Sequence, residues 1–230
     1  MNLNTDALCK FPRGALPLKY LIRDREDLDL PISGIDHDVE ISGPIAGADL
    51  TPELRNFLKD FREEHADHSY LNSEFHAQLE DELSLDERSH HFIAYRDGEI
   101  LGVVRATEAP FELSHMTAEL KEAAADFGDY FEISRMILSQ KGRERWVGLI
   151  LCFALVEWGI TTQKKGLVAL CRQVNARRFG FLGFKVVGDR EFRISQRENG
   201  TYRLMASRWS DFEDRVGMIF GEKIIQALHH

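Results

Sequence analysis

A strand followed by a long helix is predicted by the segment YFEISRMILSQKGRERWVG, residues 130–148. Tyr130 to Leu138 contains aromatic and aliphatic residues that are common in strands. Trp146 to Thr162 is apolar over a length that suits a helix better than a strand. The turn between them is basic and ends where the helix begins. Backbone N–H groups at such a helix start attract anions.

A helix and a hairpin precede this segment. The helix opens at Thr51 and keeps an apolar face at helical spacing. A second helix is expected over Glu74 to Leu83. Phe92 to Tyr95 and Ile100 to Arg105 read as two strands joined by an Asp97-Gly98 turn, a strong short-range hairpin signal. The apolar face of the first helix consists of Leu54, Phe57, Leu58, Phe61 and His65.

The remaining elements alternate between helices and strands. We expect a helix near Thr117 to Ala125, a strand at Leu167 to Leu170 and a helix at Ala176 to Leu182. Two closing strands are expected at Phe184 to Val187 and Tyr202 to Ala206. This order predicts an α/β fold with a mixed central sheet and helices on both faces.

The first 50 residues differ in composition from the rest. Residues 1–50 carry an acidic run at Asp24 to Asp29, followed by Gly and Pro punctuation, and are predicted to be an irregular arm with one strand candidate, Lys19 to Arg23. Residues 51–230 are predicted to form one domain. The amphipathic C-terminal run from Phe212 to Ile224 is expected to cover the core.

Charge and cysteine usage limit the partners and the compartment. The net charge of -9 and pI near 5.5 disfavour general binding to nucleic acid or to an anionic membrane. The three cysteines lack CxxC spacing, which fits a reducing compartment. The N-terminus lacks the apolar stretch of a signal peptide. The most apolar run, Trp146 to Ile160, is too short to span a membrane and contains Glu157. A soluble cytoplasmic protein is expected.

The order of elements and the turn after Leu138 resemble the GNAT acyltransferases. These enzymes bind the pyrophosphate of acyl-CoA through R/Q-x-x-G-x-G/A at the strand-to-helix junction, where glycines bring backbone N–H groups close to phosphate. Arg143 and Gly148 match this motif, whereas Trp146 replaces the middle glycine and Glu144 stands where glycine is frequent. The resemblance implies a GNAT fold and an acyl-thioester donor held by this turn.

The two departures favour one donor over another. An indole and a carboxylate crowd and repel a pyrophosphate, whereas the phosphopantetheine arm of an acyl carrier protein carries a single phosphodiester. We therefore expect an acyl carrier protein as donor, with acyl-CoA as the alternative, and no tightly bound cofactor. Lys141, Arg143 and Arg145 would offer a basic edge to the acidic carrier.

A second resemblance narrows the branch of the family. Glu132-x-Ser134-Arg135, preceded by Gly102-x-x-Arg105, resembles the N-acyl amino acid synthases and the N-acyl-homoserine-lactone (autoinducer) synthases. The stretch VNARRFGFLGF, residues 174–184, resembles the GNAT helix that ends in Gly-Phe. Phe179 takes the place of the Tyr that protonates the thiolate in many acetyltransferases, a Tyr that autoinducer-type enzymes also tend to lack.

Strand geometry sets the expected arrangement of this motif. Side chains alternate along a strand, so Glu132 and Ser134 should share one face, while Ile133 and Arg135 share the other.

The chemistry of amide formation assigns candidate roles. The attacking amine must lose a proton, and the thioester oxygen becomes negative. Glu132 is the candidate base, acting directly or through water, and Arg105 and Arg135 would bind an acceptor carboxylate or hold Glu132. Ser134 completes the candidate catalytic set. Backbone N–H groups of Met136, Ile137 and Leu138 are the candidate oxyanion donors. The further candidates for donor binding are Arg143, Arg145, Trp146, Val147, Gly148 and Phe179.

The acceptor and two competing functions stay open. Autoinducer synthases bind S-adenosylmethionine through an Arg, Phe, Trp, Asp, Asp series, and the stretch Arg55 to Phe75 contains no Trp. The expected acceptor is therefore the amine of an amino acid or a related small molecule. An acyl-CoA-dependent N-acetyltransferase and a non-catalytic GNAT-like binding module are the alternatives.

No metal is expected. The histidines at 65, 68, 90 and 91 lack a third defined metal ligand.

Overall fold

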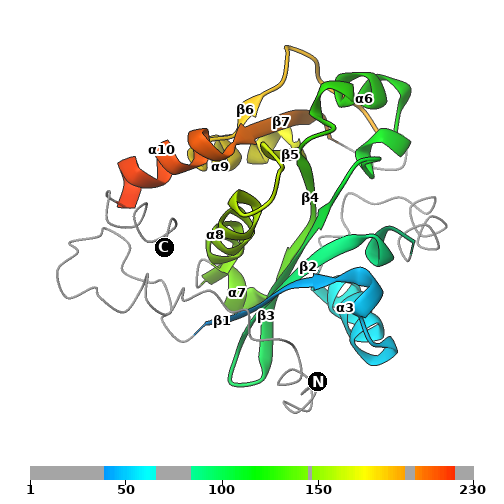
Figure 1. Cartoon of the computed structure of the whole chain (residues 1–230), viewed down its shortest axis with the longest axis vertical. Helices are drawn as coiled ribbons and strands as arrows, with labels where there is room; N and C mark the ends of the chain where they lie inside the picture. Colours follow the sequence, from blue (N-terminus) through cyan, green and yellow to red (C-terminus); the bar gives the residue numbers. More distant parts are fainter. Residues whose placement is uncertain (1–38, 66–83, 145–146, 195–199, 221–230) are drawn as a thin grey trace.

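The computed structural model describes residues 39–65, 84–144, 147–194 and 200–220 (Figure 1). Within these residues a seven-stranded sheet has the order β1-β2-β3-β4-β5-β7-β6. β4 and β5 are parallel, and the other neighbouring pairs are antiparallel. The strands are β1 (Glu40–Ala46), β2 (Ser89–Arg96), β3 (Glu99–Thr107), β4 (Phe131–Leu138), β5 (Gly166–Arg172), β6 (Lys185–Val186) and β7 (Tyr202–Arg208).

Helices cover both faces of the sheet, as expected for the α/β class. Figure 1 shows α8 on one side of the central strands and α3 on the other. The helix expected at Glu74 to Leu83 and the strand candidate at Lys19 to Arg23 lie outside the described residues. The described α-helices are α3 (Pro52–His65), α6 (Ala118–Ala123), α7 (Gln140–Glu144), α8 (Val147–Ile160), α9 (Ala176–Phe181) and α10 (Trp209–Phe220).

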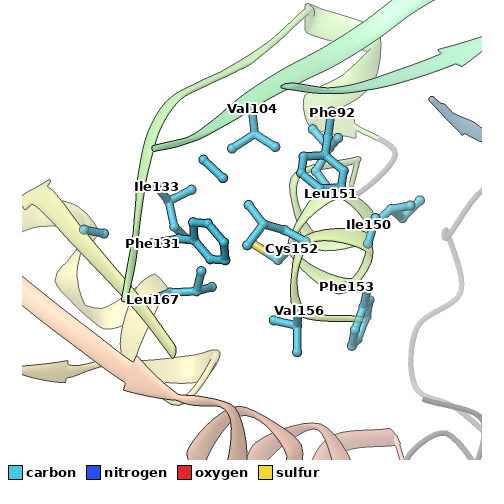
Figure 2. Close-up of a cluster of buried hydrophobic side chains, with 14 of the residues drawn as sticks. Phe92, Val104, Phe131, Ile133, Ile150, Leu151, Cys152, Phe153, Val156 and Leu167 are labelled. Carbon is cyan, nitrogen blue, oxygen red and sulfur yellow. The ribbon is translucent and has the colours of Figure 1, made fainter. Parts of the chain in front are cut away.

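The largest hydrophobic cluster lies between the sheet and α8 (Figure 2). α8 is apolar on nearly all sides because the sheet covers one side and α10 the other; Phe153 of α8 meets Phe212 of α10 edge to face at 5.7 Å. Phe212 of the predicted C-terminal run therefore belongs to the core, whereas the side chains of that run beyond residue 215 lie outside those that the structure describes. Figure 2 labels Phe92, Val104, Phe131, Ile133, Ile150, Leu151, Cys152, Phe153, Val156 and Leu167 in this cluster.

The hairpin and the first helix match their predictions. Asp97 and Gly98 both adopt positive φ, 50° and 77°, which is the geometry of a two-residue turn between right-twisted strands. Leu54, Leu58 and Phe61 of α3 are buried against the opposite face of the sheet from α8.

β1, the first described strand of the chain, comes from the predicted arm. β1 pairs with β2, with a register shift between Ser42 and Ile45 that accommodates the intervening Gly43-Pro44. Residues 40–46 thus belong to the sheet. The rest of the division into arm and domain stays a prediction.

An irregularity in the middle of β4 changes the direction of its side chains. Ser134 pairs with Arg105, but the next pair joins Ile137 to Val103, so β4 has one residue more than β3 in this interval. Arg135 within it has a φ of 51°, in the left-handed region that a non-glycine residue rarely adopts. A β-bulge of this kind re-aims the side chain that it contains.

β4 and β5 pair only along their first halves. The pairs are Phe131 with Leu167, Glu132 with Val168 and Ile133 with Ala169. β4 continues to Leu138 and β5 to Arg172, yet no further pair joins these two strands within the described chain. The second half of β4 is therefore bonded to β3 on one edge and lacks a β5 partner on the other.

No helix in the described part of the chain has the length and apolar content needed to cross a membrane.

Candidate active site

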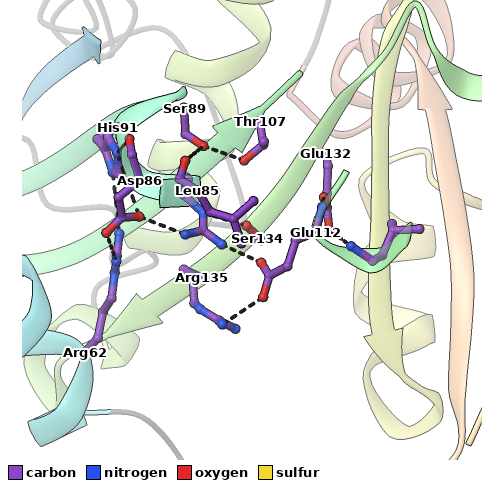
Figure 3. A network of polar contacts seen from close by, with 12 residues as sticks. Arg62, Leu85, Asp86, Ser89, His91, Thr107, Glu112, Glu132, Ser134 and Arg135 are labelled. Carbon is purple, nitrogen blue, oxygen red and sulfur yellow. Dashed lines mark hydrogen bonds and ion pairs between the residues drawn. The ribbon is translucent and has the colours of Figure 1, made fainter. Parts of the chain in front are cut away.

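A chain of buried ion pairs crosses the sheet face that α3 covers (Figure 3). Arg105 of β3 lies at its centre and is fully buried. Its Nη1 donates to Asp86 Oδ1 at 2.8 Å, its Nη2 to Glu112 Oε2, and its Nε to Ser134 Oγ at 3.0 Å. Every edge of the guanidinium plane thus has a partner, which fixes its orientation.

Asp86 joins Arg105 to α3. Its second oxygen accepts from Nη1 of Arg62 at 2.7 Å. Burial raises the pKa of Asp86, but the charges of Arg62 and Arg105 outweigh burial and hold that pKa at about 2. Asp86 is therefore an anion throughout the physiological range and keeps two buried guanidinium groups compensated.

His91 of β2 completes this end of the network as a neutral ring. Burial lowers its pKa to about 4, although Asp86 opposes the shift. Its Nε2 lies 2.9 Å from the Asp86 carbonyl oxygen and so donates to it, and its Nδ1 faces Arg62 Nη2 at 3.5 Å. No group of three or more metal-ligating side chains gathers within the described residues, and His68 lies outside them.

Glu112 joins Arg105 to Arg135. Arg135 Nη2 lies 2.8 Å from the second carboxylate oxygen of Glu112. The expectation that Arg135 shares a face with Ile133 is wrong, because the bulge turns Arg135 toward the side of Arg105, whereas Ile133 packs in the α8 cluster. With 16% of its side chain exposed, Arg135 is the most accessible of the three arginines in this chain of pairs.

Glu132 lies beside this chain and binds backbone. Its carboxylate accepts from the N–H groups of Glu112 and Leu113, at the start of the 3-10 turn Leu113–His115. Only 2% of Glu132 is exposed. Burial, followed by the neighbouring charge of Glu112, raises the pKa of Glu132 to about 8 against the opposing effect of Arg105 and the two N–H groups. It therefore both anchors the loop and titrates near neutral pH.

The predicted residues gather, and residues outside the prediction link them. Arg105 and Arg135 both pair with Glu112, Ser134 bonds to Arg105, and Glu132 binds the backbone N–H of Glu112. Arg105 contacts Ser134, Asp86 and Glu112 directly, whereas its effect on Glu132 is only electrostatic. Sequence reasoning missed the linking residues Arg62, Asp86 and Glu112.

The candidate oxyanion donors follow the bulge. Met136, Ile137 and Leu138 are half-buried and lie in the half of β4 that β5 does not pair. Met136 and Leu138 pack toward α8, and Ile137 packs toward α3. The Leu138 carbonyl accepts from Arg143 Nη1 at 3.0 Å. Apart from this contact, the edge of β4 that faces away from β3 has no β5 backbone as a partner beyond Ile133 in the described chain.

The turn after β4 forms the short helix α7. Ser139 caps it: the Gly142 N–H donates to Ser139 Oγ at 3.1 Å, and the Arg143 N–H donates to the Ser139 carbonyl at 3.0 Å. A Cβ on Gly142 would lie 2.0 Å from the Leu101 carbonyl oxygen, so glycine allows α7 to rest on β3. These two N–H groups are thus already bonded within the protein.

The predicted basic edge is partly neutralised. Lys141 Nζ bonds both carboxylate oxygens of Glu99, at 2.9 and 2.7 Å, and Arg143 folds back on Leu138 and Gln140. Arg145 lies outside the described residues, as does Trp146.

The other donor-site candidates lie at the start of α8 and in α9. Val147 is fully buried. Gly148 lies against β4, since a Cβ there would be 3.2 Å from Leu138 and 3.6 Å from Met136. Phe179 is half-buried in α9 and meets Phe184 edge to face at 5.3 Å. Of these residues, Gly148 packs against the second half of β4, whereas Phe179 packs on Phe184. Their part in donor binding stays a prediction.

Comparison with known families agrees with the fold. Residues 52–184 match the family described as acetyltransferase (GNAT) family. The chain belongs to the GNAT family and is an acyltransferase with the GNAT fold. A comparison with curated protein sequences gives no significant match.

Several solved structures share this fold at low sequence identity. FeeM, an N-acyl amino acid synthase from uncultured soil microbes, superposes with a TM-score of 0.57 at 12% identity over 74% of this chain and 93% of its own. An acyl-CoA N-acyltransferase from Pseudomonas aeruginosa gives 0.52 at 18% over 74% and 98%. Spermidine N-acetyltransferase from Vibrio cholerae, in complex with CoA and spermine, gives 0.51 at 13% over 77% and 99%. These likenesses show the fold and leave the donor and the acceptor open.

Proposed function

We propose that this enzyme transfers a medium or long acyl chain from an acyl carrier protein to the amine of an amino acid or a related small molecule. One observation carries the proposal: the buried Arg105–Glu112–Arg135 chain of ion pairs meets β4 at its bulge, where β4 loses its pairing with β5. A polar, charged group of residues thus adjoins a strand edge with unpaired backbone.

The strand edge is the proposed binding place of the thioester arm. Phosphopantetheine contains two amide groups, which can bond to the unpaired side of β4 much as an added strand would. The thioester oxygen would then lie against the N–H groups of Met136 and Leu138, which are fixed before the reaction begins. The N–H of Ile137 points to β3 instead, because N–H directions alternate along a strand and the Ser139 N–H two residues on bonds to the Leu101 carbonyl.

The transfer step requires a group that accepts a proton. The amine nitrogen bonds to the thioester carbonyl carbon and loses a proton, the C–S bond breaks, and the carrier leaves as a thiolate that takes up a proton from water. Glu132 is the proposed acceptor of the amine proton, because its pKa of about 8 is close to the working range of a general base. With 2% exposure, Glu132 would reach the amine through water.

Arg135 is the proposed contact for the acceptor carboxylate. It is the most exposed arginine in the chain of ion pairs, and Glu112 holds it from one side. A guanidinium binds a carboxylate through two parallel hydrogen bonds. An amino acid that approached Arg135 in this way would bring its α-amine to the bulge. FeeM, by its description an N-acyl amino acid synthase, is a precedent for such an acceptor on this fold.

The turn after β4, which forms α7, supports the carrier protein over CoA as donor. In α7, the N–H groups of Gly142 and Arg143 bond to Ser139, and Arg143 bonds to Leu138. A pyrophosphate would have to displace these contacts. A single phosphodiester requires fewer N–H donors.

A thiol-release assay tests the proposal. The purified protein is given acyl carrier proteins and acyl-CoAs with matched chains, with and without a mixture of amino acids. We expect thiol release that requires both an acyl carrier protein and an amino acid. Glu132→Gln should lose about 10²-fold or more in rate, whereas Glu122→Gln, a change at an exposed carboxylate of α6, should not.

The two alternatives give different results in the same assay. If thiol is released from acyl-CoA and from no acyl carrier protein, the donor is acyl-CoA. This result would be in line with the acyl-CoA N-acyltransferase and the spermidine N-acetyltransferase that share the fold. Absence of release from every donor, with every amine, would contradict the proposed transfer and favour a binding module.

A further inference from the structure

We propose that the outer face of α9, with the turn before it, is the docking surface for the acyl carrier protein. This outer face consists of Val174, Arg177, Arg178 and Phe181. The inference rests on the proposed use of a carrier-protein donor and locates the surface that would recognise it.

Exposed apolar side chains gather on this part of the molecule. Among the described residues, the exposed large hydrophobic side chains are Val174, Phe181 and Val186, with 74%, 58% and 43% of their surface accessible. All three fall within a stretch of 13 positions, 174–186. Apolar side chains scattered singly are ordinary, whereas a local group is typical of a binding surface.

Helical spacing puts the four residues of the outer face on one side. The 3-10 turn Gln173–Asn175 runs directly into α9, and positions 174, 177, 178 and 181 follow the i, i+3, i+4, i+7 rule. The opposite side of α9 packs on the core through Ala176, Phe179 and Leu182. The residues of the outer face are therefore apolar or basic, and they do not pack in the core of the described chain.

The charges on the outer face are uncompensated. Arg177 and Arg178 are exposed and form no ion pair with any described residue. Nearby Lys185 and Arg203 differ, because they pair with Asp211 and Glu191 at 2.5 and 2.7 Å. Two guanidinium groups that no described residue pairs with, between two exposed apolar side chains, suit an acidic partner with an apolar contact of its own.

The position of α9 connects the docking surface to the candidate active site. α9 follows β5 after a single turn, at the end of β5 that does not pair with β4. A carrier protein on the outer face would therefore sit beside the unpaired half of β4, from which its prosthetic arm can reach the bulge. The basic edge predicted from Lys141 and Arg143 is less suitable, since Glu99 and Leu138 already bind those side chains.

A second copy of this chain is a poorer fit than a carrier protein. The chain has a net charge of -9, so two copies repel each other at long range. An acidic carrier would share that general repulsion but would bring acidic side chains to Arg177 and Arg178, whereas in a two-fold dimer the outer face meets its own copy and these arginines oppose each other.

Charge reversal tests the docking surface. In the full-length protein, Arg177→Glu/Arg178→Glu should raise KM for an acyl carrier protein by about tenfold or more at low salt, because attraction becomes repulsion. Phe181→Ala should raise the same KM without changing its dependence on salt. A short acyl-pantetheine thioester with the same chain lacks the carrier protein, so its kcat/KM should stay within about twofold. Lys121→Glu, a charge reversal on the exposed side of α6, is the matched control and should leave both donors unaffected.

Three results would overturn the docking surface. The first is an unchanged KM for the carrier protein in both variants. This result would contradict the docking surface but not the proposed use of a carrier protein as donor. The second is an equal loss with both donors, which would indicate damage to the fold or the active site. The third is a dimer in light scattering that the double variant dissociates. Failure of every carrier protein as donor for the wild-type enzyme would instead overturn the proposed function itself.

Discussion

At the scale of single residues, the site depends on side chains that are far apart in the sequence. Glu132, Ser134 and Arg135 were predictable because they share one short motif, and Arg105 because it ends the hairpin. Asp86 and Glu112 were not, because each becomes a partner of Arg105 only when the sheet and its loops assemble. Isolated acidic residues outside any motif give no signal of this kind in one sequence.

Removal of Arg105 should destabilise the protein strongly. Arg105→Ala leaves the carboxylates of Asp86 and Glu112 buried with one partner fewer each, and such a loss typically costs about 3–5 kcal/mol. We expect the free energy of unfolding, measured in urea, to fall by that amount. Arg88→Ala, which removes an arginine whose Nη1 bonds to the Glu108 carbonyl near the surface, is the control. A loss below about 1 kcal/mol for Arg105→Ala, the level of an exposed ion pair, would contradict the role assigned to it.

The pH dependence of turnover should report Glu132. A base accepts a proton only when ionised, so kcat/KM should rise as pH increases through about 8, the pKa of Glu132. In Glu132→Gln this rise should disappear together with most of the activity. If the variant keeps the rise and loses only stability, Glu132 acts as an anchor of the backbone at Glu112 and Leu113 and not as the base.

The raised pKa of Glu132 affects folding stability in the opposite direction from activity as pH rises. Because the pKa of Glu132 is raised from 4.5 to about 8, the folded state prefers the protonated carboxyl. This contribution to stability is complete below pH 4.5 and is lost as pH rises toward 8. Activity and stability are thus expected to change in opposite directions over this interval.

At the scale of elements, local patterns predicted most of the helices and strands that the structure describes. The hairpin, α3, α8 and β4 follow from turn residues and apolar spacing. β1 was missed because Gly43-Pro44 interrupts it, and a register shift in its pairing with β2 accommodates that interruption. The bulge at Arg135 was missed because alternation assumes a regular strand. Its cause lies in the pairing with β3, which the sequence of β4 alone does not contain.

The apolar helix α8 contains one carboxyl group that should lower stability at high pH. Glu157 is 6% exposed, and burial raises its pKa from 4.5 to about 7. The folded state therefore prefers the protonated form, and this contribution to stability is lost as pH rises from 4.5 through 7. Glu157→Gln should stabilise the protein by roughly 1 to 3 kcal/mol at pH 8 and have little effect at pH 4.

Thermal unfolding at several pH values checks the assignment of Glu157. The difference in midpoint between Glu157→Gln and the wild type should grow from pH 4 to pH 8. Glu213→Gln, at a half-buried carboxylate on the neighbouring helix α10, is the matched control. A constant or shrinking difference for Glu157→Gln would show that the buried carboxyl is compensated within the protein.

At the scale of the whole molecule, the GNAT fold brings three features to one place. The sheet supplies an unpaired strand edge, the ion pairs between α3 and β4 supply a rigid polar group, and α9 supplies a basic, apolar surface beside the end of β5. The family could be inferred from the order of elements and the motifs. The donor could not, because it depends on a turn in which Glu144 and Trp146 depart from the family pattern. The acceptor could not, because it depends on contacts at the assembled site.

The most direct measurement is mass spectrometry of lipophilic products from cells that express this chain, beside cells that express Glu132→Gln. The proposed function predicts an N-acyl amino acid, with a medium or long chain, that is abundant with the wild type and nearly absent with the variant. Extracts that are identical for both, or that contain only a short acetylated amine, would contradict it.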